Sequence, residues 1–238
     1  MLTVPQYTSL YDGLAARGVQ LVNTPQRYAF CHQLPNSYPV LEGETPRSVW
    51  CPVAGEPDFG AILGCAARLG PGPAVLKDYV KSQKHYWNEA CYIPDTTDRA
   101  RVEAVVRRFL ELQGSELNGG LVFRSYLPLE VVGQHPESGM PLAAEFRSFW
   151  FDGKLVLSHK YWGDLTSFDT ELPLAWMQGV VGRIDSAFFT MDVALKEDGT
   201  WIVIELGDGQ VAGLPSRELA PEFFRDLREV VASRYGSM

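Results

Sequence analysis

The sequence has 238 residues, 46% hydrophobic and 21% charged, a balance that excludes disordered, collagen-like and disulfide-dense chains. Lys and Arg number 21 against 29 Asp and Glu, a formal net charge of −8, which disfavours non-specific binding to nucleic acid. There is no apolar run near the roughly 20 residues of a membrane-spanning helix and no signal-peptide pattern. The four cysteines are widely spaced. We therefore expect a cytoplasmic protein with free thiols that binds neither nucleic acid nor membrane.

The first third of the chain is predicted to be mainly helical. Thr3 followed by Gln6, with Pro5 between them, is a capping-box start for a helix. Gly and Pro interrupt both helices and strands, so the Gly-Pro-Gly-Pro run at 70–73 is the clearest break in the chain. We place a domain boundary there, dividing residues 1–72 from 73–238. The elements expected before it are helices at 3–18, 26–32 and 57–69 and a short buried strand at 19–22.

The remainder of the chain mixes strands with helices, which favours an α+β or α/β fold; we expect α+β. Two segments carry an Asp-Gly pair between apolar runs, the strongest short-range signal for a β-hairpin. The elements expected here are strands at 74–80 and 120–127, helices at 98–112, at 173–185 and from 221 onward, and hairpins at 143–162 and 188–206.

The first hairpin is predicted to gather charged side chains. If Asp152-Gly153 fills a two-residue turn, Glu145 lies opposite Lys160, and Arg147 lies opposite Ser158. Side chains alternate between faces along a strand, so Glu145, Arg147 and Lys160 would share one face. An alternative interpretation is a solvated sheet face with an ordinary cross-strand ion pair.

The second hairpin is predicted to oppose two carboxylates. With Asp198-Gly199 as the turn, Asp192 lies directly opposite Glu205, and both sit in apolar runs. Such a pair repels and needs a shared proton, a nearby Lys or Arg, or a divalent cation. Oxygen-only ligation favours Mg²⁺, and Asp208 and Gln210 in the following loop could add oxygen ligands. A register slip of one residue would separate the carboxylates.

A lysine-rich segment follows the boundary at 72/73. Lys77, Tyr79 and Lys81 alternate to one face of the predicted strand, and Lys84 follows. Cations beside carboxylates in an acidic chain suit a polyphosphate held with Mg²⁺. The alternative is a solvated lysine-rich loop.

Four strings in this order, VLKDYVKSQKHYW, GLVFRSYLPLE, EFRSFWFDGKLV and VIELGDGQVAGL, resemble an ATP-grasp protein, and more narrowly the prokaryotic and phage clade named for one Arg and two Lys. The resemblance implies an ATP-grasp fold, in which two α+β lobes grip the nucleotide, over 73–238, with a partial pre-ATP-grasp segment at 1–72. It also implies an ATP- and Mg²⁺-dependent ligase. In this family a carboxylate is phosphorylated to an acyl phosphate that an amine attacks, with release of ADP and phosphate.

The resemblance assigns roles to residues of this sequence in three groups. Nucleotide binding is assigned to Lys77 at the α/β-phosphates, to Lys81, to Glu145 at the ribose and to the hinge residues Arg124, Ser125, Tyr126 and Leu127 at the adenine. Catalysis is assigned to Arg147 and Lys160, which would neutralise the β/γ-phosphates and the transferring phosphoryl group. Metal binding is assigned to Asp192 and Glu205, with Asp208 as the candidate substitute for an Asn usual in the family where this chain has Gly207.

Two other functions stay open. One is an ATP-binding module without ligase turnover. The other is a nucleotidyltransferase in which Lys77 becomes adenylylated, although the Lys-x-Asp-Gly signature of such enzymes is absent. The four histidines lie in no metal-ligand or nucleophile motif, and His159 is predicted to face away from the charged patch of the first hairpin.

Overall fold

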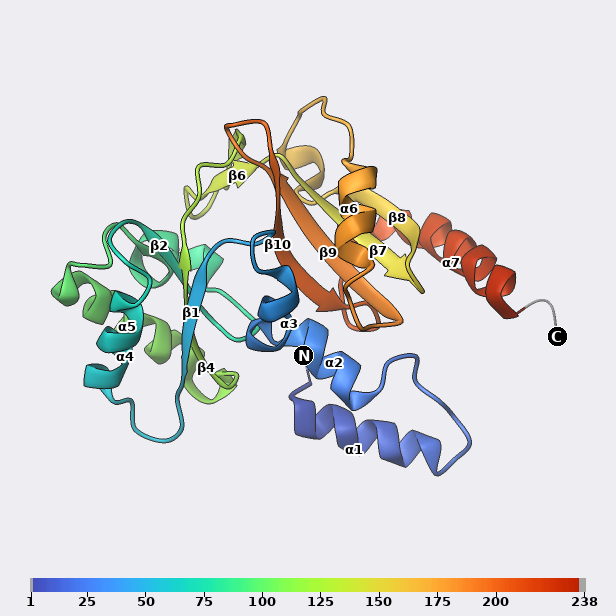
Figure 1. Ribbon diagram of the computed structural model, residues 1–238, viewed down its shortest axis with the longest axis horizontal. Coiled ribbons are helices and arrows are strands. Elements are labelled where there is room, and N and C mark those ends of the chain that lie inside the picture. Colours follow the sequence, from blue (N-terminus) through green and yellow to red (C-terminus); the bar gives the residue numbers. More distant parts are fainter. Residues whose placement is uncertain (1, 236–238) are drawn as a thin grey trace. The chain divides into compact units, whose positions relative to one another are not determined.

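A computed structural model describes residues 2–235, without the side chains of Asp164 and Tyr235 (Figure 1). The chain divides into two compact units that are interleaved in the sequence. Unit 1 comprises the described residues up to 41, residues 129–133 and those from 142 on; unit 2 comprises 42–128 and 134–141. Helices combined with antiparallel sheets confirm the α+β class. The glycine- and proline-rich run at 70–73 lies inside unit 2, and the functional division at 72/73 stays a prediction.

Unit 1 is built on a four-stranded antiparallel sheet with strand order β10-β9-β7-β8. One face of the sheet packs on α2, α3 and α6 through a buried cluster that includes Phe146, Met191 and Val193. Part of the other face packs on α7, where Phe149 contacts Phe223. The elements of unit 1 are α1 (Val4–Ala15), α2 (Pro25–His32), α3 (Leu34–Leu41), β7 (Glu145–Phe151), β8 (Lys154–Lys160), η4 (Gly163–Leu165), α6 (Leu174–Val181), β9 (Phe188–Leu195), β10 (Trp201–Asp208), η5 (Arg217–Leu219) and α7 (Ala220–Tyr235).

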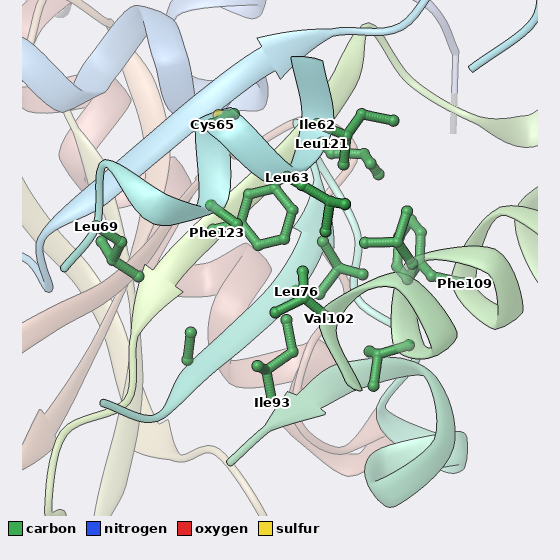
Figure 2. Close-up of a cluster of buried hydrophobic side chains, with 14 of the residues drawn as sticks. Ile62, Leu63, Cys65, Leu69, Leu76, Ile93, Val102, Phe109, Leu121 and Phe123 are labelled. Carbon is green, nitrogen blue, oxygen red and sulfur yellow. The ribbon is translucent and has the colours of Figure 1, made fainter. Parts of the chain in front are cut away.

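Unit 2 is built on a second four-stranded antiparallel sheet, with order β1-β4-β2-β3. Helices α4 and α5 cover it through a core that includes Ile62, Leu76, Phe109 and Phe123 (Figure 2). Its elements are β1 (Ser48–Pro52), α4 (Phe59–Ala67), β2 (Ala74–Asp78), η1 (Lys84–Tyr86), the π-helix η2 (Trp87–Cys91), β3 (Tyr92–Ile93), α5 (Arg99–Gln113), η3 (Gly114–Glu116) and β4 (Gly120–Ser125). A separate two-stranded ribbon pairs β5 (Val131–Gln134) with β6 (Pro141–Ala143).

The N-terminal predictions are partly confirmed. The capping box forms as expected, because the Thr3 hydroxyl accepts from the Gln6 backbone N–H and the Gln6 side chain accepts from the Thr3 N–H. The strand expected at 19–22 is wrong: Val19 and Val22 are exposed, and the Val22 N–H donates to the Gln210 side chain rather than to a strand. The sequence pattern does not predict helix α3 or strand β1.

The first hairpin has the expected turn and an unexpected register. Asp152 and Gly153 both have positive φ (48° and 75°), as a two-residue hairpin turn between right-twisted strands requires. A β-bulge then interrupts the ladder at Phe149 and Trp150, and the extra residue on β8 shifts every later pair by one. The pairings predicted for Glu145 with Lys160 and for Arg147 with Ser158 are therefore wrong. Arg147 lies opposite His159, and Phe146 lies opposite Lys160.

In the second hairpin two deviations cancel. The loop is longer than expected, because Lys196 pairs with Thr200 and the Gly199 N–H donates to the Lys196 carbonyl. The two-residue turn predicted at Asp198-Gly199 is therefore wrong. The Asp198 side chain caps the loop by accepting from the Thr200 N–H at 2.9 Å. A bulge between Val203 and Glu205 restores the register. The predicted pairing of Asp192 with Glu205 is confirmed.

Candidate functional site

A row of charged and polar side chains crosses the whole sheet of unit 1. Arg147 on β7 lies opposite Asp192 on β9, and Asp192 lies opposite Glu205 on β10. His159 on β8 lies on the other side of Arg147. Directly opposed residues of antiparallel strands point to the same face of the sheet. We call these four residues (His159, Arg147, Asp192 and Glu205) the polar row.

The guanidinium of Arg147 compensates the opposed carboxylates. Its Nε and one terminal nitrogen donate to the two Asp192 oxygens at 2.8 and 2.6 Å, a bidentate pair, and Asp192 is only 2% exposed. The guanidinium also lies 4.6 Å from the centre of the Tyr161 ring. Burial works against the charged form, but the hydrogen bonds and charge of Asp192 outweigh it and raise the pKa of Arg147. Of the three forms of compensation expected from the sequence, the structure shows a nearby cation.

The polar row sets one guanidinium, that of Arg147, beside two carboxylates, those of Asp192 and Glu205. In the part of the chain that the structure describes, no cluster of three or more His, Cys, Asp or Glu is arranged to hold a metal ion. Two carboxylates are nevertheless enough for Mg²⁺, which usually keeps several waters and takes the rest of its shell from phosphate oxygens. The donor set of the polar row therefore fits Mg²⁺.

Thr190 and Gly207 form the next cross-strand pair on the same face. A Cβ atom placed on Gly207 would lie 2.6 Å from the Thr190 hydroxyl oxygen, closer than side-chain atoms approach. An Asn at this position would therefore displace that hydroxyl. The sequence interpretation missed Thr190, although the register predicted for the second hairpin already placed it opposite Gly207.

The structure does not bring Asp208 to the polar row. Side chains alternate along β10, so Asp208 points to the opposite face, where it is fully buried. Its carboxylate accepts from the Asn23 side chain at 2.6 Å and from the Gln210 N–H at 2.9 Å. Burial raises the pKa of Asp208, and these hydrogen bonds oppose the rise.

Lys160 also lies apart from the polar row. The bulge in the first hairpin places it opposite Phe146. Its ammonium group donates to the Phe168 carbonyl and lies 4.6 Å from the centre of the Phe168 ring. His159 takes the position opposite Arg147, so the face predicted for this histidine is wrong. Glu145 remains on the Arg147 side, buried, and accepts from the Trp162 indole N–H at 3.1 Å.

In unit 2 the predicted lysines differ in environment. Lys77 lies on β2 opposite Val122 and is 7% exposed. The strand ends at Asp78, whose buried carboxylate accepts the Val80 and Lys81 N–H groups and so turns the chain. Lys81 is exposed beyond this turn. The alternation predicted to bring Lys81 to the face of Lys77 therefore stops at Asp78.

The hinge segment 124–127 has part of its backbone already engaged. The Ser125 N–H donates to the Arg47 carbonyl at 2.8 Å, and the Tyr126 N–H donates to the Pro73 carbonyl at 2.9 Å. The buried Arg124 side chain donates to the Thr45 hydroxyl at 2.5 Å. An adenine would have to bind other backbone groups of this segment.

An aromatic group adjoins the hinge segment. Tyr126 lies edge-on to Tyr92, with ring centres 5.3 Å apart, and 6.2 Å from the ring centre of Trp87. All three rings are half-buried, so they give this part of unit 2 an apolar, π-rich surface suited to contact with a flat base.

Over the described residues, none of the helices has the length and apolar composition needed to cross a membrane.

Comparison with known proteins identifies the fold. Residues 68–227 match the model of an ATP-grasp domain, family 3 of the clade named for one Arg and two Lys. Among solved structures, C-terminally truncated Cdc123 from Schizosaccharomyces pombe aligns with a TM-score of 0.55 and 14% identity, over 85% of this chain and 94% of that one. D-alanine–D-alanine ligase from Bacillus anthracis, complexed with ATP, aligns with a TM-score of 0.55 and 17% identity, over 97% and 75%.

A third structure is similar to the same extent. The RimK domain protein ATP-grasp from Sphaerobacter thermophilus DSM 20745 aligns with a TM-score of 0.53 and 16% identity, over 85% of this chain and 67% of that one. None of the curated proteins matches. At identities of 14–17% the solved structures show the fold alone. The ATP-grasp fold predicted from the four motifs is confirmed.

Proposed function

Because the chain belongs to the ATP-grasp clade named for one Arg and two Lys, in its family 3, we propose that it is an ATP- and Mg²⁺-dependent ligase that joins a carboxylate to an amine. The observation that carries the proposal is the polar row, which opposes Asp192 and Glu205 on one sheet face and sets Arg147 beside them. The family supplies the reaction type, and the row supplies the charges that this reaction needs.

Asp192 and Glu205 are the proposed ligands of Mg²⁺, with the Thr190 hydroxyl as a third oxygen on the same face. A bound Mg²⁺ would screen the negative charge of the ATP phosphates. The bidentate pair with Arg147 fixes the orientation of the Asp192 carboxylate. Arg147 also has a donor left over for an anion, because among the described residues its second terminal nitrogen, which carries two hydrogens, donates to the Gly213 carbonyl alone, at 3.2 Å. We assign it to the charge that develops on the transferring phosphoryl group.

The remaining nucleotide contacts are proposed for residues that each unit supplies. In unit 2, Lys77 would bind the phosphates as a buried point charge, and backbone groups of 124–127 other than the Ser125 and Tyr126 N–H would bind the adenine. The exposed Lys81 would contact phosphate from its loop. In unit 1, Glu145 would accept from the ribose hydroxyls. Lys160 and Asp208 are not included, because they lie on the other face of their sheet.

The proposed reaction has two steps. The substrate carboxylate attacks the γ-phosphorus of ATP, the bond to the bridging oxygen breaks, and ADP leaves. The amine then attacks the carbonyl carbon of the acyl phosphate, loses a proton and expels phosphate, which forms the C–N bond. Arg147 contributes by stabilising negative charge on the phosphoryl oxygens in the first step.

A second candidate function is ATP binding without turnover. The observation in its favour is that Arg147 already occupies both oxygens of Asp192, while Gly207 supplies no side-chain ligand. The two functions predict the same nucleotide affinity and differ in product.

Calorimetric titration with a non-hydrolysable ATP analogue, with and without Mg²⁺, tests the shared part of both functions. We expect Mg²⁺-dependent binding in the wild type and its loss in Lys77→Ala and Glu205→Gln. Glu197→Gln, an exposed carboxylate in the loop of the same hairpin, is the matched control and should bind like the wild type. Unaltered binding in Glu205→Gln would remove the metal assignment.

Analysis of the products then separates the two functions. The protein is incubated with ATP, Mg²⁺ and a panel of carboxylates and amines. Substrate-dependent release of ADP and phosphate supports the ligase. Bound ATP that stays intact with every substrate pair supports the binding module. AMP together with a protein-bound adenylate would contradict both and support an adenylylated lysine instead.

A further inference from the structure

Two of the four cysteines lie together in unit 2, apart from the polar row. Cys65, labelled in Figure 2, is 3% exposed on α4. Cys51 is half-buried on β1, the strand against which α4 packs. Both belong to or contact the core of this unit. Cys51 packs against the buried cluster that contains Cys65. One terminal nitrogen of Arg68 donates both to the Cys65 sulfur and to the carbonyl of Trp50, the residue before Cys51, which places the Cys65 sulfur beside this part of β1.

A guanidinium completes this cluster. Arg68, the residue that caps the C-terminus of α4, donates to the Cys65 sulfur at 3.2 Å and to the Trp50 carbonyl at 3.0 Å. The Arg68 carbonyl accepts from the Arg47 side chain at 3.0 Å, which fixes this end of the helix. Cys65 thus accepts from a cationic donor and lies next to the strand that carries Cys51.

These contacts favour the thiolate of Cys65. The interaction with Cys51 lowers the pKa of Cys65 to about 6, with burial acting against it and Arg68 in support. The same interaction raises the pKa of Cys51. The pKa of Arg68 is raised by Cys65, and that of Tyr79 is raised mainly by burial and further by the two sulfurs.

The other two cysteines provide the contrast within the same chain. Burial raises the pKa of Cys31 to about 12 and that of Cys91 to about 11. Both are buried and lack an arginine donor of the kind that Arg68 supplies among the described contacts. Thiol reactivity follows the thiolate, so Cys65 is the cysteine of this chain whose surroundings favour reaction, and Cys51 is the thiol that lies near it.

We propose that Cys51 and Cys65 are an oxidation site at which a hydroperoxide closes a reversible disulfide between β1 and α4. The Cys65 thiolate attacks one peroxide oxygen and the O–O bond breaks, which leaves a sulfenic acid and a hydroxide that is protonated to water. The Cys51 thiol then attacks the Cys65 sulfur and expels the second water. Two thiols and one hydrogen peroxide become one disulfide and two waters, and a dithiol reductant reverses the change.

The disulfide would act on the sheet that carries Lys77. Strand β1 pairs with β4, and β4 pairs with β2, on which Lys77 lies opposite Val122. The crosslink would close the chain between residues 51 and 65, including the exposed stretch 54–56, and tie α4 to the edge strand. The oxidised protein should therefore resist proteolysis in this stretch more than the reduced protein does.

The test is oxidation of the full-length wild-type protein with one equivalent of hydrogen peroxide. Free thiols are counted in denaturant, and the bonded peptides are identified by mass spectrometry. We expect the number of thiols to fall from four to two, a single crosslink between the Cys51 and Cys65 peptides, and full recovery with dithiothreitol. Loss of Cys31 or Cys91 before the pair, or no crosslink at all, would overturn the proposal.

Variants identify the attacking sulfur. Cys65→Ser should react with peroxide at least about tenfold more slowly, because the remaining thiols are protonated near neutral pH, whereas Cys51→Ser should still form a sulfenic acid that a dimedone probe traps. Cys31→Ser is the matched control and should form the crosslink at the wild-type rate. Arg68→Gln should slow the reaction. A Cys65→Ser variant that reacts like the wild type would contradict the assignment, and thermal melting checks that each variant is folded.

Discussion

The two faces of the sheet in unit 1 bury a carboxylate in different ways. On one face Asp192 is held by the guanidinium of Arg147 and stands beside a second carboxylate, Glu205. On the other face Asp208 is held by the neutral amide of Asn23 and by a backbone N–H. The first arrangement sets two carboxylates and a guanidinium on one face, groups suited to an ion and its phosphates. The second is fully buried and anchors the segment after α1. Under the proposed function, one face of this strand pair binds the ligand and the other stabilises the fold.

The largest effect is expected from breaking the charged pair. Asp192→Ala leaves the buried guanidinium of Arg147 without its bidentate partner, and the loss of one member of a buried pair costs about 3–5 kcal/mol. Urea denaturation measures the free energy of unfolding. Glu197→Gln, on the exposed loop of the same hairpin, should stay within about 0.5 kcal/mol of the wild type. A similar small change in Asp192→Ala would mean that the pair is not formed in solution.

The second-largest loss of stability is expected from replacing Asn23, whose side-chain amide binds Asp208 on the opposite face of the sheet. The Asn23 side chain donates to Asp208 and to the Phe188 carbonyl, and it accepts from the N–H groups of Ala187 and Phe188. Asn23→Ala leaves several buried polar groups unsatisfied, at about 1–3 kcal/mol for such a group. We expect a loss of roughly 2–3 kcal/mol in the free energy of unfolding, with greater protease sensitivity of α1. An unchanged stability would contradict the anchoring role.

A steric test concerns Gly207, which has no side chain and lies on the sheet face that carries the polar row. Gly207→Asn forces a Cβ onto the Thr190 hydroxyl and should destabilise the fold by about 1–3 kcal/mol, as overpacking does. Thr190→Ala in the same chain removes the clash, so the double variant should recover most of the loss and bind Mg²⁺ through the new carboxamide. Additive effects of the two substitutions would show that the residues do not touch.

The smallest effect is expected in the pH dependence of the free energy of unfolding, to which the buried carboxylate of Asp208 contributes. Burial raises the pKa of Asp208 above its ordinary value of 3.8. A raised pKa in the folded state contributes stability that is complete below the unfolded value and is lost as pH rises through the folded value. The wild type should therefore lose stability relative to Asp208→Asn as pH rises from about 4 upward. Denaturation curves at a series of pH values measure this, and parallel pH profiles of the two proteins would contradict it.

Much of this architecture follows from local sequence signals. The Thr3 cap, the Asp98-capped helix α5 and the turn at Asp152-Gly153 are determined by neighbouring residues and can be predicted from them. Helix α3, with Pro39 inside it, lacks such a signal, and its formation depends on packing of Leu41 against the sheet of unit 1. The sequence pattern likewise does not predict that Asp198 caps a loop longer than two residues.

The candidate site shows the limit of counting along strands. An Asp-Gly turn determines the nearest pair only, and a single bulge then decides which face every later residue takes. In the first hairpin the bulge places His159, instead of the predicted Ser158, opposite Arg147 and moves Lys160 to the other face. In the second hairpin a longer loop and a bulge cancel and keep Asp192 opposite Glu205. The residues of the row are thus predictable except where a bulge, determined by tertiary packing, intervenes.

The most direct test of the account is Mn²⁺ binding, followed by electron paramagnetic resonance as a probe of the Mg²⁺ site in the presence of a non-hydrolysable ATP analogue. The wild type should bind Mn²⁺ in a nucleotide-dependent manner, and Glu205→Gln should weaken that binding at least about tenfold, since one of two carboxylate ligands is lost. Glu197→Gln and Asp208→Asn should leave it unchanged. Equal Mn²⁺ affinity in Glu205→Gln and the wild type would contradict the polar row as the metal site.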